Sequence, residues 1–122
     1  MNKMTSLGAT LGVDIGTTGC RCVAYSGEAE VVAKAECLYP TSSPKPGWAE
    51  QDSVLVIAQV EQCIRLAVKS AAAAHYNVML ISFSAVNHGI IPMCEDESLR
   101  PCIIWADNRS ASITEKWRSE GR

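Results

Sequence analysis

The sequence predicts an α/β protein in which a helix packs on a β-sheet, and three features of the chain lead to this prediction. Short apolar runs separated by turn residues fill the N-terminal part of the chain, as expected for neighbouring strands. A long segment with apolar residues at helical spacing follows them. The next run is apolar on both faces and has the length of a buried strand. The predicted order is strand, strand, strand, helix, strand, hairpin, helix.

The N-terminal part of the chain is expected to form an antiparallel meander. Tight turns rich in Gly, Thr and Ser separate its apolar runs, and a loose, polar lead-in over residues 1–8 precedes them. A loop containing three of the five prolines follows, at 40–47. The three strands are expected at 9–14, 21–25 and 30–38.

The surest element is a helix from Asp52 to about His75, where apolar side chains recur every three or four residues. Asp52 or Ser53 is expected to cap its first turn. The strand at 78–84 should lie parallel to the first strand and, being apolar on both faces, should be central in the sheet beside it.

The C-terminal part of the chain is expected to form a hairpin and a helix. The two short strands are predicted at 90–94 and 102–105, joined by an acidic turn at 95–99. The helix is predicted at 109–118, with Asp107 or Asn108 as its cap.

Composition sets limits on the class of protein. Of the 122 residues, 48% are hydrophobic and 20% are charged, which is typical of a globular chain and suits one domain. The 11 Lys and Arg against 13 Asp and Glu give a formal net charge of −2, so no electrostatic reason exists to expect nucleic acid or a membrane as partner. Without a transmembrane-length apolar run or a convincing signal peptide, we expect a cytoplasmic protein.

The six cysteines favour free, mostly buried thiols, because none forms a C-x-x-C pair and neither histidine stands at zinc-ligand spacing. Cys20 and Cys22 should point to the same face of a strand. A structural zinc site or a disulfide is the alternative. The six lie at positions 20, 22, 37, 63, 94 and 102.

The first motif with chemical potential runs from Asp14 to Arg21. Its Gly-Thr turn follows a carboxylate at a strand end, so backbone amides and hydroxyls could bind a phosphate while Asp14 holds a magnesium ion. Arg21, across the hairpin, could face the same anion. An ordinary β-turn explains the same residues equally well. The pattern is not a Walker loop.

Three further motifs each have an ordinary structural explanation as well. Residues 47–52 (GWAEQD) suit a loop with an anchoring Trp and a helix cap. The strand ending in Asn87 and His88 puts polar side chains at a sheet edge, where α/β proteins bind ligands, although a lone His is more often a loop residue. Residues 105–110 (WADNRS) set polar groups beside an indole, which suits a polyhydroxylated ligand or a helix cap.

Together, and in this order, the four motifs resemble the FGGY family of carbohydrate kinases over residues 11–109. The resemblance implies the N-terminal portion of a ribonuclease-H-like mixed sheet with helices, of the actin and hexokinase type. It also implies an enzyme that transfers the γ-phosphoryl of ATP to a sugar or sugar-acid hydroxyl with Mg²⁺. Residues 82–85 and 105–110 look most like the gluconokinase branch. Asn87 suits neither that branch nor the xylulokinases, so the sugar stays open.

The resemblance also implies roles for particular residues. Asp14 is expected to hold the magnesium ion. The residues expected beside this ion and the ATP phosphates are Asp14, Gly16, Thr17, Thr18 and Arg21. Those expected to bind the sugar are Asn87, His88, Trp105, Asp107 and Arg109.

One departure from the family pattern concerns the whole chain. The catalytic Asp of the family and its adenosine-binding residues belong beyond residue 122, so residues 1–122 are expected to be a partial N-terminal kinase domain without the second, ATP-binding domain. Phosphoryl transfer needs both walls of the cleft, so this chain alone should be inactive. We expect this chain to self-associate or to be only marginally stable, or the complete enzyme to form a homodimer. The alternatives are a xylulokinase- or glycerol kinase-like member, or a non-catalytic, actin-like sugar-binding module.

Overall fold

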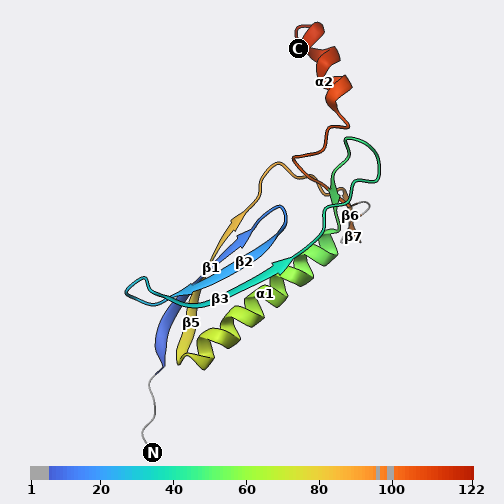
Figure 1. Cartoon of the computed structure of the whole chain (residues 1–122). Coiled ribbons are helices and arrows are strands. Elements are labelled where there is room, and N and C mark those ends of the chain that lie inside the picture. The colour runs from blue at the N-terminus through green and yellow to red at the C-terminus, as the bar shows by residue number, and fades with distance from the viewer. Residues whose placement is uncertain (1–5, 96, 99–100) are drawn as a thin grey trace, which may run out of the picture. The chain divides into compact units, whose positions relative to one another are not determined.

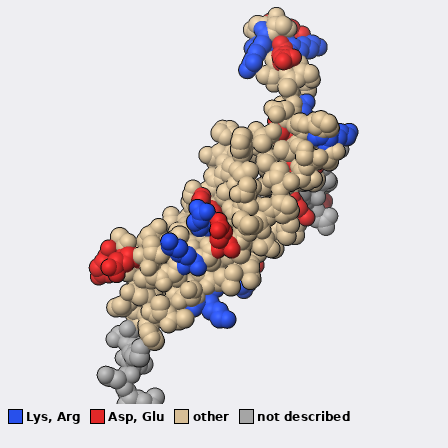
Figure 2. Space-filling model, viewed as in Figure 1, with Lys and Arg blue, Asp and Glu red and all other residues tan. Residues whose placement is uncertain are grey.

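The computed structural model describes residues 6–95, 97–98 and 101–122, which form two compact units (Figure 1). One unit comprises Met1–Tyr39 with Val54–Val86, and the other Pro40–Ser53 with Asn87–Arg122. Among the described residues, no helix is both long and apolar enough to cross a membrane. The face drawn in Figure 2 carries Lys and Arg next to Asp and Glu, apart from one small group of acidic side chains at the left of the view.

The first unit is built on a four-stranded sheet in the order β3-β2-β1-β5. The predicted meander is confirmed, because β1 pairs antiparallel with β2 and β2 with β3. The predicted lead-in was too long, since β1 already begins at Leu7 within the described part of the chain. Residues 1–5 lie outside it. The strands are β1 (Leu7–Ile15), β2 (Gly19–Tyr25), β3 (Val31–Leu38) and β5 (Tyr76–Ala85).

Helix α1 (Ser53–Ala73) lies along one face of this sheet, close to its predicted bounds (Figure 1). Its buried residues are small and four positions apart, at Cys63, Ala67 and Ala71, so the helix backbone comes close to the sheet. Alternate residues of β1 and β2, such as Leu11 and Cys22, face it and complete the core. The helix is followed by His75 in the left-handed conformation (φ 65°), which is common at helix C-termini.

Strand β5 corrects one prediction. It pairs parallel with β1, as expected, but it lies at the edge of the sheet and not in its centre. Tyr76 and Val78, at its start, pack against the core, whereas Met79 is 71% exposed and Phe83 60%. The apolar pattern was interpreted as burial on both faces. A hydrophobic pattern indicates that a strand is suited to burial, but it does not identify which segment packs over that strand.

The second unit contains short strands and one helix. Its sheets pair β4 (Glu50–Gln51), which the sequence did not predict, with β8 (Cys102–Ile103), and β6 (Met93–Cys94) with β7 (Glu97–Ser98). The predicted strands at 90–94 and 102–105 were therefore too long, and β7 falls inside the predicted turn. A single antiparallel bridge, Ile90 to Ile103, joins the two predicted segments.

Helix α2 (Ala111–Ser119) begins two residues later than predicted, and the predicted caps are wrong. Ser110 occupies the cap position and makes no side-chain capping hydrogen bond. The carboxylate of Asp107 is already bonded to Ala49 and Arg109, and Asn108 contributes its backbone carbonyl, which accepts the Ala111 amide at 3.0 Å. Because the Asp107 carboxylate is bonded to these groups, it is not available to cap α2.

Candidate functional site

The first unit carries a pocket of about 250 Å³ on the sheet face opposite α1. Asp14 and Arg21 lie side by side there, because they are register partners on β1 and β2. Ser82 and Ser84 of β5 join them, since Gly12 pairs with Ser82 and Asp14 with Ser84. The sheet register thus gathers a carboxylate, a guanidinium and two hydroxyls.

Asp14 and Arg21 differ in how far the protein engages them. Asp14 is exposed and has no hydrogen bond or ion pair among the described residues, so its oxygens are available to a ligand. Arg21 donates to Glu36 Oε1 at 2.9 Å, with both side chains more than half exposed. Such an exposed ion pair contributes little to stability and can open to receive an anion.

The Gly-Thr turn between β1 and β2 is held by internal bonds. The Gly16 amide donates to the Gly19 carbonyl at 2.9 Å, and the Tyr39 hydroxyl donates to the Gly16 carbonyl at 2.6 Å. The Tyr39 amide donates to the Thr18 carbonyl at 3.2 Å. Burial raises the pKa of Tyr39, so this donor keeps its proton over the neutral range. The turn adjoins the pocket, but Gly16, Thr17 and Thr18 do not line it.

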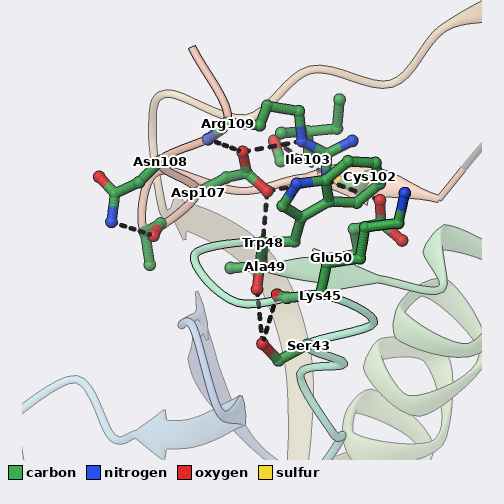
Figure 3. A network of polar contacts seen from close by, with 11 residues as sticks. Ser43, Lys45, Trp48, Ala49, Glu50, Cys102, Ile103, Asp107, Asn108 and Arg109 are labelled. Atoms are coloured by element: carbon green, nitrogen blue, oxygen red, sulfur yellow. Dashed lines mark hydrogen bonds and ion pairs between the residues drawn. The ribbon is translucent and has the colours of Figure 1, made fainter. Parts of the chain in front are cut away.

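In the second unit, Arg109 is the centre of a network of polar contacts (Figure 3). Its Nε and Nη2 donate to the two carboxylate oxygens of Asp107 at 2.8 and 2.7 Å, and Nη2 also donates to Glu50 Oε1 at 2.7 Å. The Asp107 side chain is 3% exposed, so this is a shielded ion pair. The hydrogen bond from Arg109 holds the pKa of Asp107 well below its usual value, and the pKa of Arg109 is raised in return.

Trp48 provides an aromatic surface for this network. The Arg109 guanidinium carbon lies 3.8 Å from the centre of the Trp48 ring, and the Lys45 ammonium lies 4.7 Å from it. Both distances fall within the range of cation–π attraction. Asp107 Oδ2 accepts the amide of Ala49, next to Trp48, at 2.7 Å and so ties the two loops together (Figure 3).

A pocket of about 490 Å³ adjoins the network within the same unit. Four of the five predicted sugar-binding residues line it, namely His88, Trp105, Asp107 and Arg109, whereas Asn87 does not. Isoleucines at 90, 103 and 104 form its apolar wall. His88 is in the left-handed conformation (φ 65°), which His adopts more readily than most residues. An apolar wall with a few converging polar groups is typical of a small-molecule site.

Sequence reasoning missed two pairs of residues, one in the pocket of the first unit and one in the network around Arg109. Ser82 and Ser84 were noticed in a strand-end motif but given no role, although their spacing of two already put both on one face. Trp48 was explained as a loop anchor, and Glu50 only belonged to the same motif, since β4, which carries Glu50, was not predicted. Only the three-dimensional contact with Arg109 identifies them.

The sheet order β3-β2-β1-β5, with α1 on one face, is the N-terminal portion of the ribonuclease-H-like fold of the actin and hexokinase type, as predicted. Solved structures that share this fold include sugar kinases. A profile described as the FGGY family of carbohydrate kinases, N-terminal domain, matches residues 9–122. The chain belongs to this family.

Relatives within the family agree with this assignment. The chain is 36% identical over 111 residues to the gluconokinase of Bacillus subtilis (strain 168), covering 90% of this chain and 21% of that protein. The crystal structure of gluconate kinase from Lactobacillus acidophilus matches with a TM-score of 0.85 and 32% identity, over 95% of this chain and 23% of that one. A ligand-bound xylulose kinase from the same organism also gives 0.85, at 31% identity over 94% and 23%. Glycerol kinases are among the relatives too.

Proposed function

We propose that this chain is the N-terminal part of an ATP-dependent kinase that phosphorylates a hydroxyl of a sugar or sugar acid, with gluconate as the first candidate. The chain spans 21% to 23% of the relatives described above, and the ATP-binding second domain and the catalytic Asp of the family are not among its residues. The observation that carries the proposal is the pocket of the second unit, which His88, Trp105, Asp107 and Arg109 line together.

The residues of the first unit fit a magnesium ion and phosphate groups. Asp14 offers exposed carboxylate oxygens, which Mg²⁺ prefers as ligands, and the hydroxyls of Ser82 and Ser84 lie in the same pocket. Arg21 supplies a guanidinium for phosphate oxygens. When bound, the magnesium ion would neutralise charge on the phosphate groups during transfer.

The residues of the second unit would bind and orient the sugar. The exposed indole of Trp105 offers an apolar surface to the C–H groups of a sugar ring or chain, and His88 can exchange hydrogen bonds with hydroxyls. Arg109 is held in place by Asp107, Glu50 and Trp48, so its remaining N–H groups are preorganised. A held donor loses little freedom on binding, which favours correct placement of the reacting hydroxyl.

Charge at the pocket favours a second candidate substrate, a neutral polyol such as xylulose or glycerol. The single positive charge of Arg109 is already matched by two carboxylates, Asp107 and Glu50, within 2.7 Å. The carboxylate of a sugar acid would therefore meet no surplus positive charge at the cluster of Arg109, Asp107 and Glu50. The gluconokinase-like sequence and this charge count therefore point to different sugars, and binding measurements distinguish them.

The three tryptophans make binding measurable on the chain itself, because Trp48, Trp105 and Trp117 all belong to the second unit. We expect gluconate, xylulose or glycerol to change their fluorescence in a saturable way. His88→Asn should weaken this binding by about tenfold, the effect of losing about 1.4 kcal/mol, while Asn still tolerates the left-handed backbone. His75→Asn is the matched control, since His75 has the same φ of 65° but lies after α1 in the first unit.

Turnover tests the rest of the proposal. The full-length gene product should release ADP from ATP and Mg²⁺ only when the bound sugar is present. Binding without turnover in the full-length product would favour the non-catalytic, sugar-binding module. No saturable response to any of the three compounds would remove the assignment of the pocket.

A further inference from the structure

Three thiols meet in the core of the first unit, away from both pockets. Cys20 and Cys22 point to the same face of β2, and Cys63 of α1 lies over them. All three residues are 0% exposed, and their sulfur atoms lie within 4.8 Å of one another. The Sγ atoms of Cys20 and Cys22 are 4.0 Å apart.

This spacing is close to that of a metal–thiolate site. With metal–sulfur bonds of about 2.3 Å, three sulfurs around one ion in a plane are about 4.0 Å apart. One sulfur pair already has this separation, and the others need shifts below about 1 Å. We propose that Cys20, Cys22 and Cys63 form a three-thiolate site for a soft divalent cation of the zinc group.

Charge and ligand type select the class of ion. Thiolates prefer soft cations, which excludes Mg²⁺ and Ca²⁺. Three thiolates with a divalent ion leave a net charge of −1 in the core, whereas a monovalent copper ion would leave −2. Burying the larger charge costs more free energy, so the divalent ion is favoured.

A fourth thiol, that of Cys37, lies near these three but is not one of the proposed ligands. Cys37 pairs with Cys20 across β2 and β3, yet its sulfur is not among the three that share the 4.8 Å limit. A three-coordinate site therefore fits the positions better than the tetrahedral site of structural zinc.

Binding must release protons. The Cys63 thiol donates a hydrogen bond to the Cys20 carbonyl, and a metal ion binds the thiolate form of cysteine, so each thiol must lose its proton. The balanced step is M²⁺ + 3 RSH → [M(SR)₃]⁻ + 3 H⁺, with three S–H bonds broken and three metal–sulfur bonds formed. Because the ion binds thiolates, affinity should rise with pH.

Access requires a local opening. The Cys63 thiol donates to the Cys20 carbonyl at 3.3 Å and all three sulfurs are shielded, so the ion can enter only when α1 lifts from the sheet. Uptake should be slow, and its rate should become independent of metal concentration when opening limits it.

The test is titration of the reduced chain with Cd²⁺, followed by the thiolate charge-transfer absorption in the ultraviolet. We expect one equivalent to bind, with only sulfur ligands at the cadmium X-ray absorption edge. The variant Cys94→Ala/Cys102→Ala, which removes the two thiols outside the core, should bind equally well, as should Cys37→Ala. Cys63→Ala should lose the band.

Two measurements on the unsubstituted chain keep the test valid if Cys63→Ala does not fold. An affinity that does not rise with pH, or oxygen and nitrogen ligands at the cadmium edge, would overturn the site. Retained binding in a folded Cys63→Ala variant, or loss of binding in Cys37→Ala, would overturn the assignment of these three ligands.

Discussion

Asp107 illustrates how a residue beside a ligand pocket can have a mainly structural task. Its Oδ1 accepts the Arg109 amide and Nε, and its Oδ2 accepts the Ala49 amide and Arg109 Nη2. These bonds occupy both carboxylate oxygens, so little capacity remains for a sugar. We infer that Asp107 contributes to binding by positioning Arg109 and the loop at Ala49.

Protonation of Asp107 should therefore loosen the second unit. Because the folded-state pKa lies below the unfolded value of about 3.9, the stabilisation is present above that pH and is lost as the pH falls toward the folded pKa. Tryptophan-monitored melting should show a Tm that declines below about pH 4. Asp107→Asn should have a lower Tm at neutral pH and a flatter decline. If the Tm of Asp107→Asn declined with falling pH as steeply as that of the unsubstituted chain, the decline could not be assigned to Asp107.

Asp14 is expected to act on catalysis and not on stability. Its side chain is exposed and without hydrogen bonds among the described residues, so Asp14→Ala should change Tm little. In the full-length kinase, kcat should fall by about 10²-fold or more, because positioned charge is the main device in phosphoryl transfer. Thr10→Ala, also exposed and on the same face of β1, is the control. Near-normal turnover of Asp14→Ala would remove the magnesium role.

Part of the candidate site could be predicted from single residues, and part could not. Asp14 and Arg21 were expected to meet because a tight turn fixes which residues face each other across a hairpin, and they are register partners. The contact of Trp48 with Arg109 joins positions far apart in sequence. No local pattern encodes it, so Trp48 was explained only as a loop anchor.

At the scale of elements, Gly19 is required by the approach of β2 to β3. A Cβ at this position would lie 2.7 Å from the Cys37 carbonyl oxygen, which belongs to the sheet backbone and cannot move aside. Gly19→Ala should therefore lower the free energy of unfolding by about 1–3 kcal/mol, the usual effect of overpacking. Urea unfolding measures it. Gly27→Ala, where a Cβ meets nothing within 4 Å, should be neutral, and equal losses in both would contradict this explanation.

The elements also show where sequence patterns carry information. Turn residues and helical spacing located β1, β2, β3 and α1 to within a few residues, because both signals are local. The edge position of β5 depends on which other strands are present to pair with it. Hydrophobic periodicity contains no information on that point, so β5 was misplaced.

At the scale of the whole molecule, the exposed edge strand β5 has the strongest consequence, which concerns self-association. Met79, Leu80 and Phe83 are each at least 60% exposed on an edge strand, an arrangement that favours pairing with another chain. Sedimentation should reveal self-association that rises with concentration. Met79→Lys should shift its midpoint about tenfold upward, since a charge at the edge costs about 1.4 kcal/mol or more.

A matched control separates this edge effect from a general effect of added charge. Ile57, on α1, is 61% exposed and gives the same change in charge when replaced by Lys. Ile57→Lys should associate as the unsubstituted chain does. A monomer at all concentrations before any substitution would contradict the role of β5.

The parallel pairing of β1 with β5 also has a consequence for the order of folding. Leu7 pairs with Tyr76, so these partners are about 70 positions apart, whereas the β1–β2 hairpin closes over a few residues. Closing the longer loop costs more chain entropy, so the meander should form first and β5 should join after α1 has docked. Pulsed hydrogen exchange during refolding should protect amides of β2 before those of β5. A chain emerging from the ribosome would then leave the β5 side of β1 unpaired until Ala85 has been synthesised.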